Sequence, residues 1–145
     1  YMGEKRLDLA EKSILESVRW SEIIMGTIGL VFIFFPHIII PLFTNDPKII
    51  NISIFGLRVI GVLQFFDAIG LTLWFALTGA GNTLFPAVVE SSLLWGIALP
   101  ISYFLGVKAE AGFWVPWAAV SVQIVLFSLI VSWKVRKGEW KEIEV

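Results

Sequence analysis

The sequence predicts an all-α membrane protein with four transmembrane helices. Of its 145 residues, 57% are hydrophobic, and the mean hydropathy is +0.84, whereas soluble domains are about 45–50% apolar. Four apolar runs, at 17–43, 49–78, 85–106 and 113–133, each reach the ~20 residues that cross a hydrocarbon core about 30 Å thick. The runs lack the period-two alternation of barrel strands, so we expect helices.

Residues 1–16 form a charged segment before the first run. Leu7, Ala10, Ile14 and Val18 recur every three or four residues, which predicts an amphipathic segment lying on the cytoplasmic surface of the membrane. No apolar core follows a short basic start, so the segment is not typical of a signal peptide. Because the chain does not begin with Met, we expect that it was cut from a longer polypeptide.

Turn residues separate the runs. The cluster Asn45-Asp46-Pro47 predicts a turn before the second span, and residues 79–83 predict the next one. Thr83 is expected to cap the third helix. Pro100 lies deep inside that helix and is expected to kink it. Residues 134–145 are expected to form a charged cytoplasmic tail.

The distribution of basic residues predicts the orientation. Four spans place both termini on one side, and that side holds eight basic residues: Lys5, Arg6, Lys12, Arg19, Lys134, Arg136, Lys137 and Lys141. The opposite side holds Lys48 and Lys108. The positive-inside rule therefore puts both termini in the cytoplasm. Trp20, Trp133 and Trp140 would then form the inner aromatic belt, and Trp114 and Trp117 the outer one.

Asp67 is the first candidate for a functional residue. It lies about 5 Å from the midpoint of the second run at a rise of 1.5 Å per residue, where a carboxylate costs about 2.5 kcal/mol or more to insert. At 100° per residue, Gln64, Trp74 and Thr78 share its face of the helix, so Trp74 and Thr78 are candidates for lining a substrate path. We interpret Asp67 as a carboxylate that takes up a proton or coordinates Na⁺, with Gln64 offering a carbonyl. A structural contact with a neighbouring helix is the alternative.

Three other polar residues allow two interpretations each. Arg58 lies nearer the outer surface. It is either an anchor whose charged end snorkels to the interface or a counter-ion in a substrate gate. Glu90 lies near the start of the third helix, either favoured by the positive helix N-terminus or lining a substrate path. His37 lies between two prolines, as a solvated side chain or a pH sensor.

Composition argues against several classes of function. The net charge is −1 without basic clusters, cysteine is absent, and there is one histidine. We therefore expect no nucleic-acid partner, no thiol chemistry and no histidine metal site. The sequence also lacks a nucleotide-binding loop and a nucleophile motif. We expect no enzymatic activity and no cofactor, and we expect an ion gradient as the energy source.

Five segments keep a shared order and spacing: 3–10, 41–46, 77–83, 95–103 and 136–141. Four of them are similar to the patterns P-x-F-T-x-D, L-R-G-x-G-D-T, W-x-x-x-x-P-x-x-Y and R-x-G-x-W. Thr78 and Asn82 stand where Arg and Asp are common in the third segment. Together the segments resemble the end of the second half of the MATE family (multidrug and toxic compound extrusion).

The resemblance implies that the four spans are helices nine to twelve of a twelve-helix, two-lobe transporter. Such proteins exchange cationic, amphipathic drugs for Na⁺ or H⁺. The resemblance also implies that Asp67, twelve residues before Gly79, binds the coupling cation, with a partner acid in the missing N-terminal portion. Bending at Gly61, Gly70 and Pro100 would reshape the cavity. The expected location is the cell membrane.

Two alternatives stay open at this point. One is a flippase-like exporter of the same superfamily that moves lipid-linked saccharides. The other is a self-standing four-helix protein, an oligomeric channel or structural subunit, which would bury Asp67 and Arg58 at its own interfaces.

Overall fold

Four long antiparallel helices make up the fold in a computed structural model of the chain, which describes residues 6–109, 112 and 114–142. They are α1 (Leu7–Phe34), α3 (Pro47–Gly79), a continuous helix over Leu84–Lys108, and α6 (Trp114–Lys137). All four are long and apolar enough to cross a membrane. No strand occurs among the described residues, so the all-α membrane fold is confirmed.

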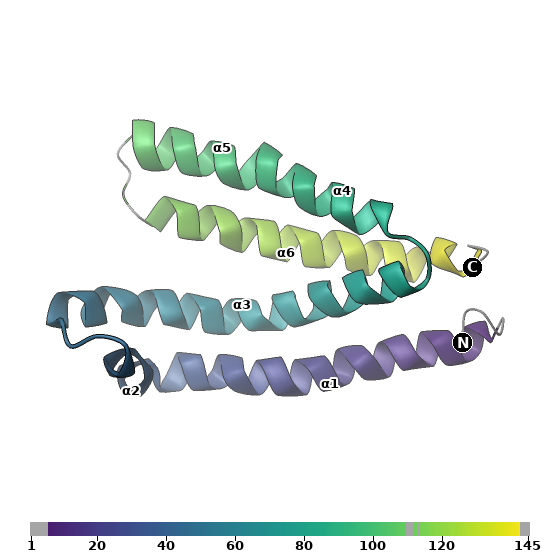
Figure 1. Cartoon of the computed structure of the whole chain (residues 1–145), viewed down its shortest axis with the longest axis horizontal. Coiled ribbons are helices and arrows are strands. Elements are labelled where there is room, and N and C mark those ends of the chain that lie inside the picture. The colour runs from purple at the N-terminus through teal and green to yellow at the C-terminus, as the bar shows by residue number, and fades with distance from the viewer. Residues whose placement is uncertain (1–5, 110–111, 113, 143–145) are drawn as a thin grey trace.

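The helices lie in a row, with α3 and α6 in the middle (Figure 1). The first span packs on the second, the second on the fourth, and the third on the fourth. Both ends of the chain lie at the same end of the long helices (Figure 1), which we call the terminal end. The other end of the helices, where α2 lies, is the distal end (Figure 1).

Helix α1 joins two segments that the sequence analysis separated. It runs from Leu7 across residue 17 without interruption, because no proline or glycine pair breaks the pattern there. It ends at Phe34, nine residues before the expected end of the span at 43. Phe35 precedes Pro36, and the proline ring disfavours the helical conformation of the residue before it. A short helix α2 (Pro36–Ile39) and a 3₁₀ turn (Ile40–Leu42) follow.

The boundaries of α3 follow from its capping residues. The Asp46 side chain accepts a 2.8 Å hydrogen bond from the Lys48 N–H, and Pro47 occupies the first turn, where its missing N–H costs nothing. At the other end Gly81 adopts φ +88, and the Asn82 N–H bonds to the Leu77 carbonyl at 2.9 Å. The predicted turn at 79–83 is present.

The prediction that Thr83 caps the third helix is wrong. Thr83 has a helical backbone, with φ −81 and ψ −32, and its side chain makes no capping hydrogen bond. Asn82, one residue earlier, provides the acceptor instead, and its Oδ1 lies 3.4 Å from the Phe85 nitrogen. The helix α4 (Leu84–Leu93) begins after this pair.

Pro100 is accommodated by a change of helix type. Two π-helical segments, Leu94–Ala98 and Ser102–Lys108, flank the short α5 (Leu99–Ile101) that contains the proline. The wider π turns shift the hydrogen bonds by one residue, as in the bond from the Leu99 N–H to the Leu94 carbonyl. The Ser102 hydroxyl also donates to the Ala98 carbonyl at 2.6 Å.

Glycines set the close approach of the spans. A Cβ added to Gly29 on α1 would lie 2.5 Å from the Gly61 carbonyl oxygen on α3. On the other side of α3, a Cβ at Gly70 would lie 3.1 Å from the Phe127 ring of α6. A side chain at position 29 would therefore force a shift of backbone, whereas one at position 70 would require the Phe127 ring to move slightly. Bending at Gly61, Gly70 and Pro100 stays a prediction.

A cluster of buried hydrophobic side chains lies at the terminal end. The cluster comprises Ala10, Leu73, Leu77, Ala80, Leu93, Phe127, Val131 and Trp140. Trp140 belongs to a 3₁₀ turn (Glu139–Glu142) that folds back against the bundle, and it is 1% exposed. Its assignment to the inner aromatic belt is therefore wrong, because its ring is covered by protein.

Some expected features fall outside the described residues. They are residues 1–5 of the amphipathic segment, the fourth-span start at Phe113, and residues 143–145 of the tail.

Candidate functional site

Asp67 lies midway along α3 and lines a cavity of about 140 Å³ between α3 and α6. Gln64, one turn earlier, lines the same cavity, as its position on the helix predicts. The remaining lining residues are apolar: Ile60, Leu63, Trp117, Val120 and Ile124. The carboxylate is therefore enclosed by hydrocarbon on several sides and has an amide beside it.

A second carboxylate belongs to the same region. Glu90 on α4 accepts a 2.7 Å hydrogen bond from the Gln123 side-chain amide on α6, and its charge interacts with that of Asp67. Gln123 is 6% exposed. Helices α3, α4 and α6 thus converge on two acids and a buried amide.

The sequence analysis did not single out Gln123. The signal was present, because a glutamine interrupts the apolar run Val120-Ser121-Val122-Gln123-Ile124-Val125. What the sequence does not contain is the pairing, since it depends on which face of the fourth span meets the third.

The other predicted site residues lie away from this cavity. Arg58 is exposed on the distal half of α3 and lines no cavity described here. Trp74 packs against Phe127, with ring centroids 5.5 Å apart. The Thr78 hydroxyl is buried and has no hydrogen-bond partner within the described ranges. His37 is exposed in α2.

Glu22, which was not among the residues predicted from the sequence, is a further acid within a span. One of its carboxylate oxygens is buried and makes no hydrogen bond to any described residue. Its neighbour Ser21 lies with its hydroxyl 3.5 Å from the Ala68 carbonyl of α3. The available signal was an acid five residues inside the predicted first run, at 17–43.

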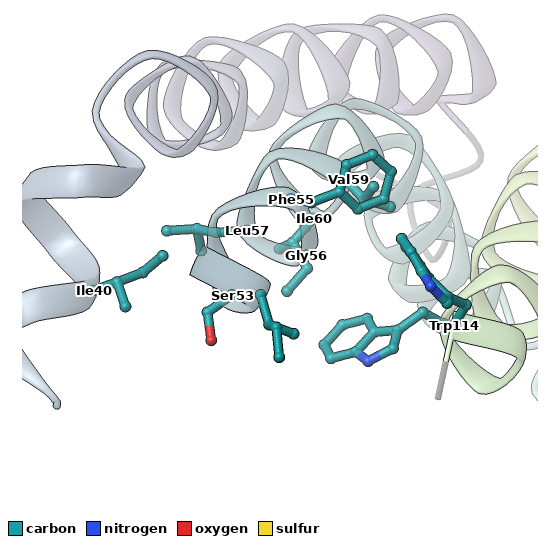
Figure 2. A pocket seen from close by; sticks show the side chains of 10 residues that line it. Ile40, Ser53, Phe55, Gly56, Leu57, Val59, Ile60 and Trp114 are labelled. Carbon is teal, nitrogen blue, oxygen red and sulfur yellow. The ribbon is translucent and has the colours of Figure 1, made fainter. Parts of the chain in front are cut away.

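A larger cavity of about 360 Å³ opens between the distal parts of α3 and α6 (Figure 2). Its wall contains Phe55, whose ring meets the Trp114 ring edge-on at 4.8 Å. Ile60 and Trp117 line both this cavity and the one that holds Asp67. The two cavities therefore adjoin.

The metal-binding potential of the described residues is limited. No group of three or more His, Cys, Asp or Glu side chains among them is arranged to hold a metal ion. A monovalent cation at Asp67 would draw its other ligands from amide, carbonyl or water oxygens, and Gln64 is the nearest amide along the helix face.

Comparisons with known proteins identify relatives among transporters. The model of the MatE family matches residues 1–104. A probable multidrug resistance protein NorM of Thermotoga maritima is 33% identical over 116 residues, covering 80% of this chain and 25% of the relative.

Two further relatives match at lower identity. The uncharacterized transporter YisQ of Bacillus subtilis is 27% identical, covering 82% of this chain and 27% of the relative. A probable multidrug resistance protein NorM of Streptococcus pneumoniae is 25% identical, covering 92% of this chain and 29% of the relative. The chain thus spans about a quarter of the length of these curated relatives. Since the family model covers more than half of the chain, the chain belongs to the MatE family, as its motifs indicated.

Proposed function

We propose that the chain is part of a cation-coupled multidrug efflux antiporter of the cell membrane, which exports cationic, amphipathic compounds in exchange for Na⁺ or H⁺. The observation that carries the proposal is the position of Asp67, within a span and at the wall of a cavity between α3 and α6. The membership of the chain in the MatE family supports transport as the activity.

The chemistry of coupling follows from the cost of charge in an apolar medium. An ionised carboxylate within the span is unfavourable until a proton or Na⁺ neutralises it. Cation binding at Asp67 therefore lowers the free energy of the conformations in which water is excluded from this region. An antiporter uses that difference to favour outward-open or inward-open states in turn.

Two polar side chains, Glu90 and Gln64, lie near Asp67. The Gln123 amide stabilises the ionised form of Glu90, since it donates to the carboxylate. Glu90 lies near Asp67, and when both carboxyl groups are ionised their two negative charges increase the attraction for a cation. Gln64 supplies a carbonyl oxygen on the same cavity wall.

The orientation and the partners are part of the proposal. Basic residues concentrate at the terminal end, so both termini face the cytoplasm. The relatives' greater length is consistent with further helices that complete the transport path and supply the partner acid of Asp67.

Efflux from cells tests the transport proposal. The full-length polypeptide that carries these residues is made in cells preloaded with a fluorescent monocationic dye, together with Asp67→Asn and a matched control, Asp8→Asn. Asp8 is exposed at the start of α1. We expect fast efflux from the parent and Asp8→Asn, and loss of active efflux from Asp67→Asn. Equal efflux by all three would overturn the role of Asp67, and no efflux by the parent would overturn the transport function.

A further inference from the structure

The two adjoining cavities between α3 and α6 have complementary chemistry. The larger has a volume of about 360 Å³, within the ~300–1,000 Å³ typical of small-molecule sites. The smaller, about 140 Å³, contains the Asp67 carboxylate. Because Ile60 and Trp117 line both, one molecule can occupy the two cavities together.

The larger cavity is built for an apolar, aromatic group. Phe55 and Trp114 form an edge-to-face pair at 4.8 Å on its wall (Figure 2), and Trp117 lies one helical turn beyond Trp114. Such rings bind aromatic bodies by stacking, and they attract organic cations through their faces. The Ser53 hydroxyl and the indole N–H groups of Trp114 and Trp117 are the polar side-chain groups of the residues that line it.

The smaller cavity is built for a small positive group. Asp67 provides the charge and Gln64 an amide oxygen. None of the described residues that line either cavity is basic. A volume of about 140 Å³ corresponds to four or five water molecules at about 30 Å³ each. An ammonium group with small substituents fits in that volume, and the Asp67 carboxylate favours such a cation over an uncharged group.

We propose that the two cavities form one binding site for an amphipathic organic monocation. Its aromatic body lies against Phe55, Trp114 and Trp117, and its ammonium group lies at Asp67. The inference rests on the proposed function and assigns that substrate class a site within these four spans. A lipid chain would fill the apolar cavity but leave the carboxylate unpaired, so charge complementarity favours the organic cation.

Ligand protection of a single thiol tests the site. The chain contains no cysteine, and Ser53 lines the larger cavity (Figure 2). Ser53→Cys is placed in the full-length polypeptide after replacement of any other cysteines, and Ser91→Cys, at an exposed serine of α4, is the control. The probes are 3-(1-naphthyl)propylammonium and its uncharged alcohol analogue. The measured quantity is the rate of modification by a membrane-permeant maleimide, in detergent and without an ion gradient.

The expected result is selective protection of Ser53→Cys. The ammonium probe should protect at about tenfold lower concentration than the alcohol, as an ion pair contributing about 1.4 kcal/mol predicts. Asp67→Asn should remove that tenfold difference while leaving the weaker protection by both probes. Trp117→Ala should weaken protection by both. Ser91→Cys should react at the same rate with or without either probe.

Three results would overturn the proposal. The first is equal protection by ammonium and alcohol when Asp67 is intact. The second is a reactive Ser53→Cys that neither probe protects. The third is an unreactive Ser53→Cys that is cross-linked to another segment of the polypeptide, because a helix would then fill the cavity.

The experiment separates this inference from the proposed function. Protection is an equilibrium measurement, whereas the proposed function is active efflux. Protection without active efflux would support the site and contradict the transport function. Active efflux without protection would leave the function standing and overturn the site.

Discussion

Gln123 on α6 donates a hydrogen bond from its side-chain amide to the Glu90 carboxylate on α4, at 2.7 Å. Gln123 is 6% exposed, so its polar group is removed from lipid and from water. The bond joins the third span to the fourth at the level where α3 presents Asp67. It connects the packing of α6 with the charge state of the candidate site.

Removing the Gln123 amide should destabilise the bundle. Gln123→Leu keeps the side-chain volume but leaves Glu90 without its donor, which costs about 1–3 kcal/mol in free energy of unfolding. A double-mutant cycle with Glu90→Ala, followed by thermal unfolding in detergent, measures the coupling. If Gln123→Leu costs the same whether or not Glu90 is present, the hydrogen bond is not the cause.

Gly29→Ala should separate α1 from α3. Its new Cβ would lie 2.5 Å from the Gly61 carbonyl oxygen, a backbone atom that cannot move without shifting the helix. We expect a loss of about 1–3 kcal/mol in unfolding free energy, as for overpacked cores. Gly79→Ala is the control, since nothing lies within 4 Å of its Cβ position. Equal stability of the two variants would contradict the close approach.

Trp140→Ala should release the C-terminal turn from the bundle. The ring is 1% exposed, and its Nε1–H donates to the Val135 carbonyl at 2.9 Å. Truncation of a buried tryptophan costs about 3–5 kcal/mol. Trp133→Ala removes a ring that is 56% exposed and should cost far less. Limited proteolysis after residue 137 measures the release. Cleavage should be faster in Trp140→Ala alone, and equally fast cleavage of Trp133→Ala would contradict the specific role of Trp140.

The C-terminal turn should loosen in acid. Hydrogen bonds from Lys134 and Lys137 hold the pKa of the Glu139 carboxyl below its ordinary value of 4.5. Because the pKa is depressed in the folded state, the stabilisation is complete above pH 4.5 and is lost as the pH falls through the folded-state pKa. The protection factors of the amides at 138–142, which are corrected for the intrinsic pH dependence of exchange, measure this stabilisation. Glu139→Gln should have lower protection factors at neutral pH that do not fall further in acid, and protection factors equal to those of the parent at every pH would contradict the role of Glu139.

Much of the fold could be predicted from local pattern, because a span is a local property of length and apolarity. Helix periodicity also placed Gln64 beside Asp67, and both line one cavity. The end of α1 at Phe34 was less predictable, since Pro36 lies inside a run that remains apolar to residue 43. Nothing local shows that the π turns around Pro100 absorb the proline.

The tertiary pairings were beyond the sequence. The bond between Gln123 and Glu90 depends on the rotation of two helices about their axes, and each helix is apolar around most of its circumference. For the same reason, the cavity that Trp114 and Trp117 line with Phe55 could not be predicted. Periodicity shows which residues share a face, but not which helix meets that face.

The central claim is that Asp67 couples a cation to export. The most direct test uses proteoliposomes of the full-length polypeptide and follows accumulation of a fluorescent monocation driven by an opposing Na⁺ or H⁺ gradient. We expect the parent and Asp8→Asn to accumulate the dye against its gradient. We expect Asp67→Asn only to equilibrate the dye. Gradient-driven accumulation by Asp67→Asn at the parent's level would contradict the claim.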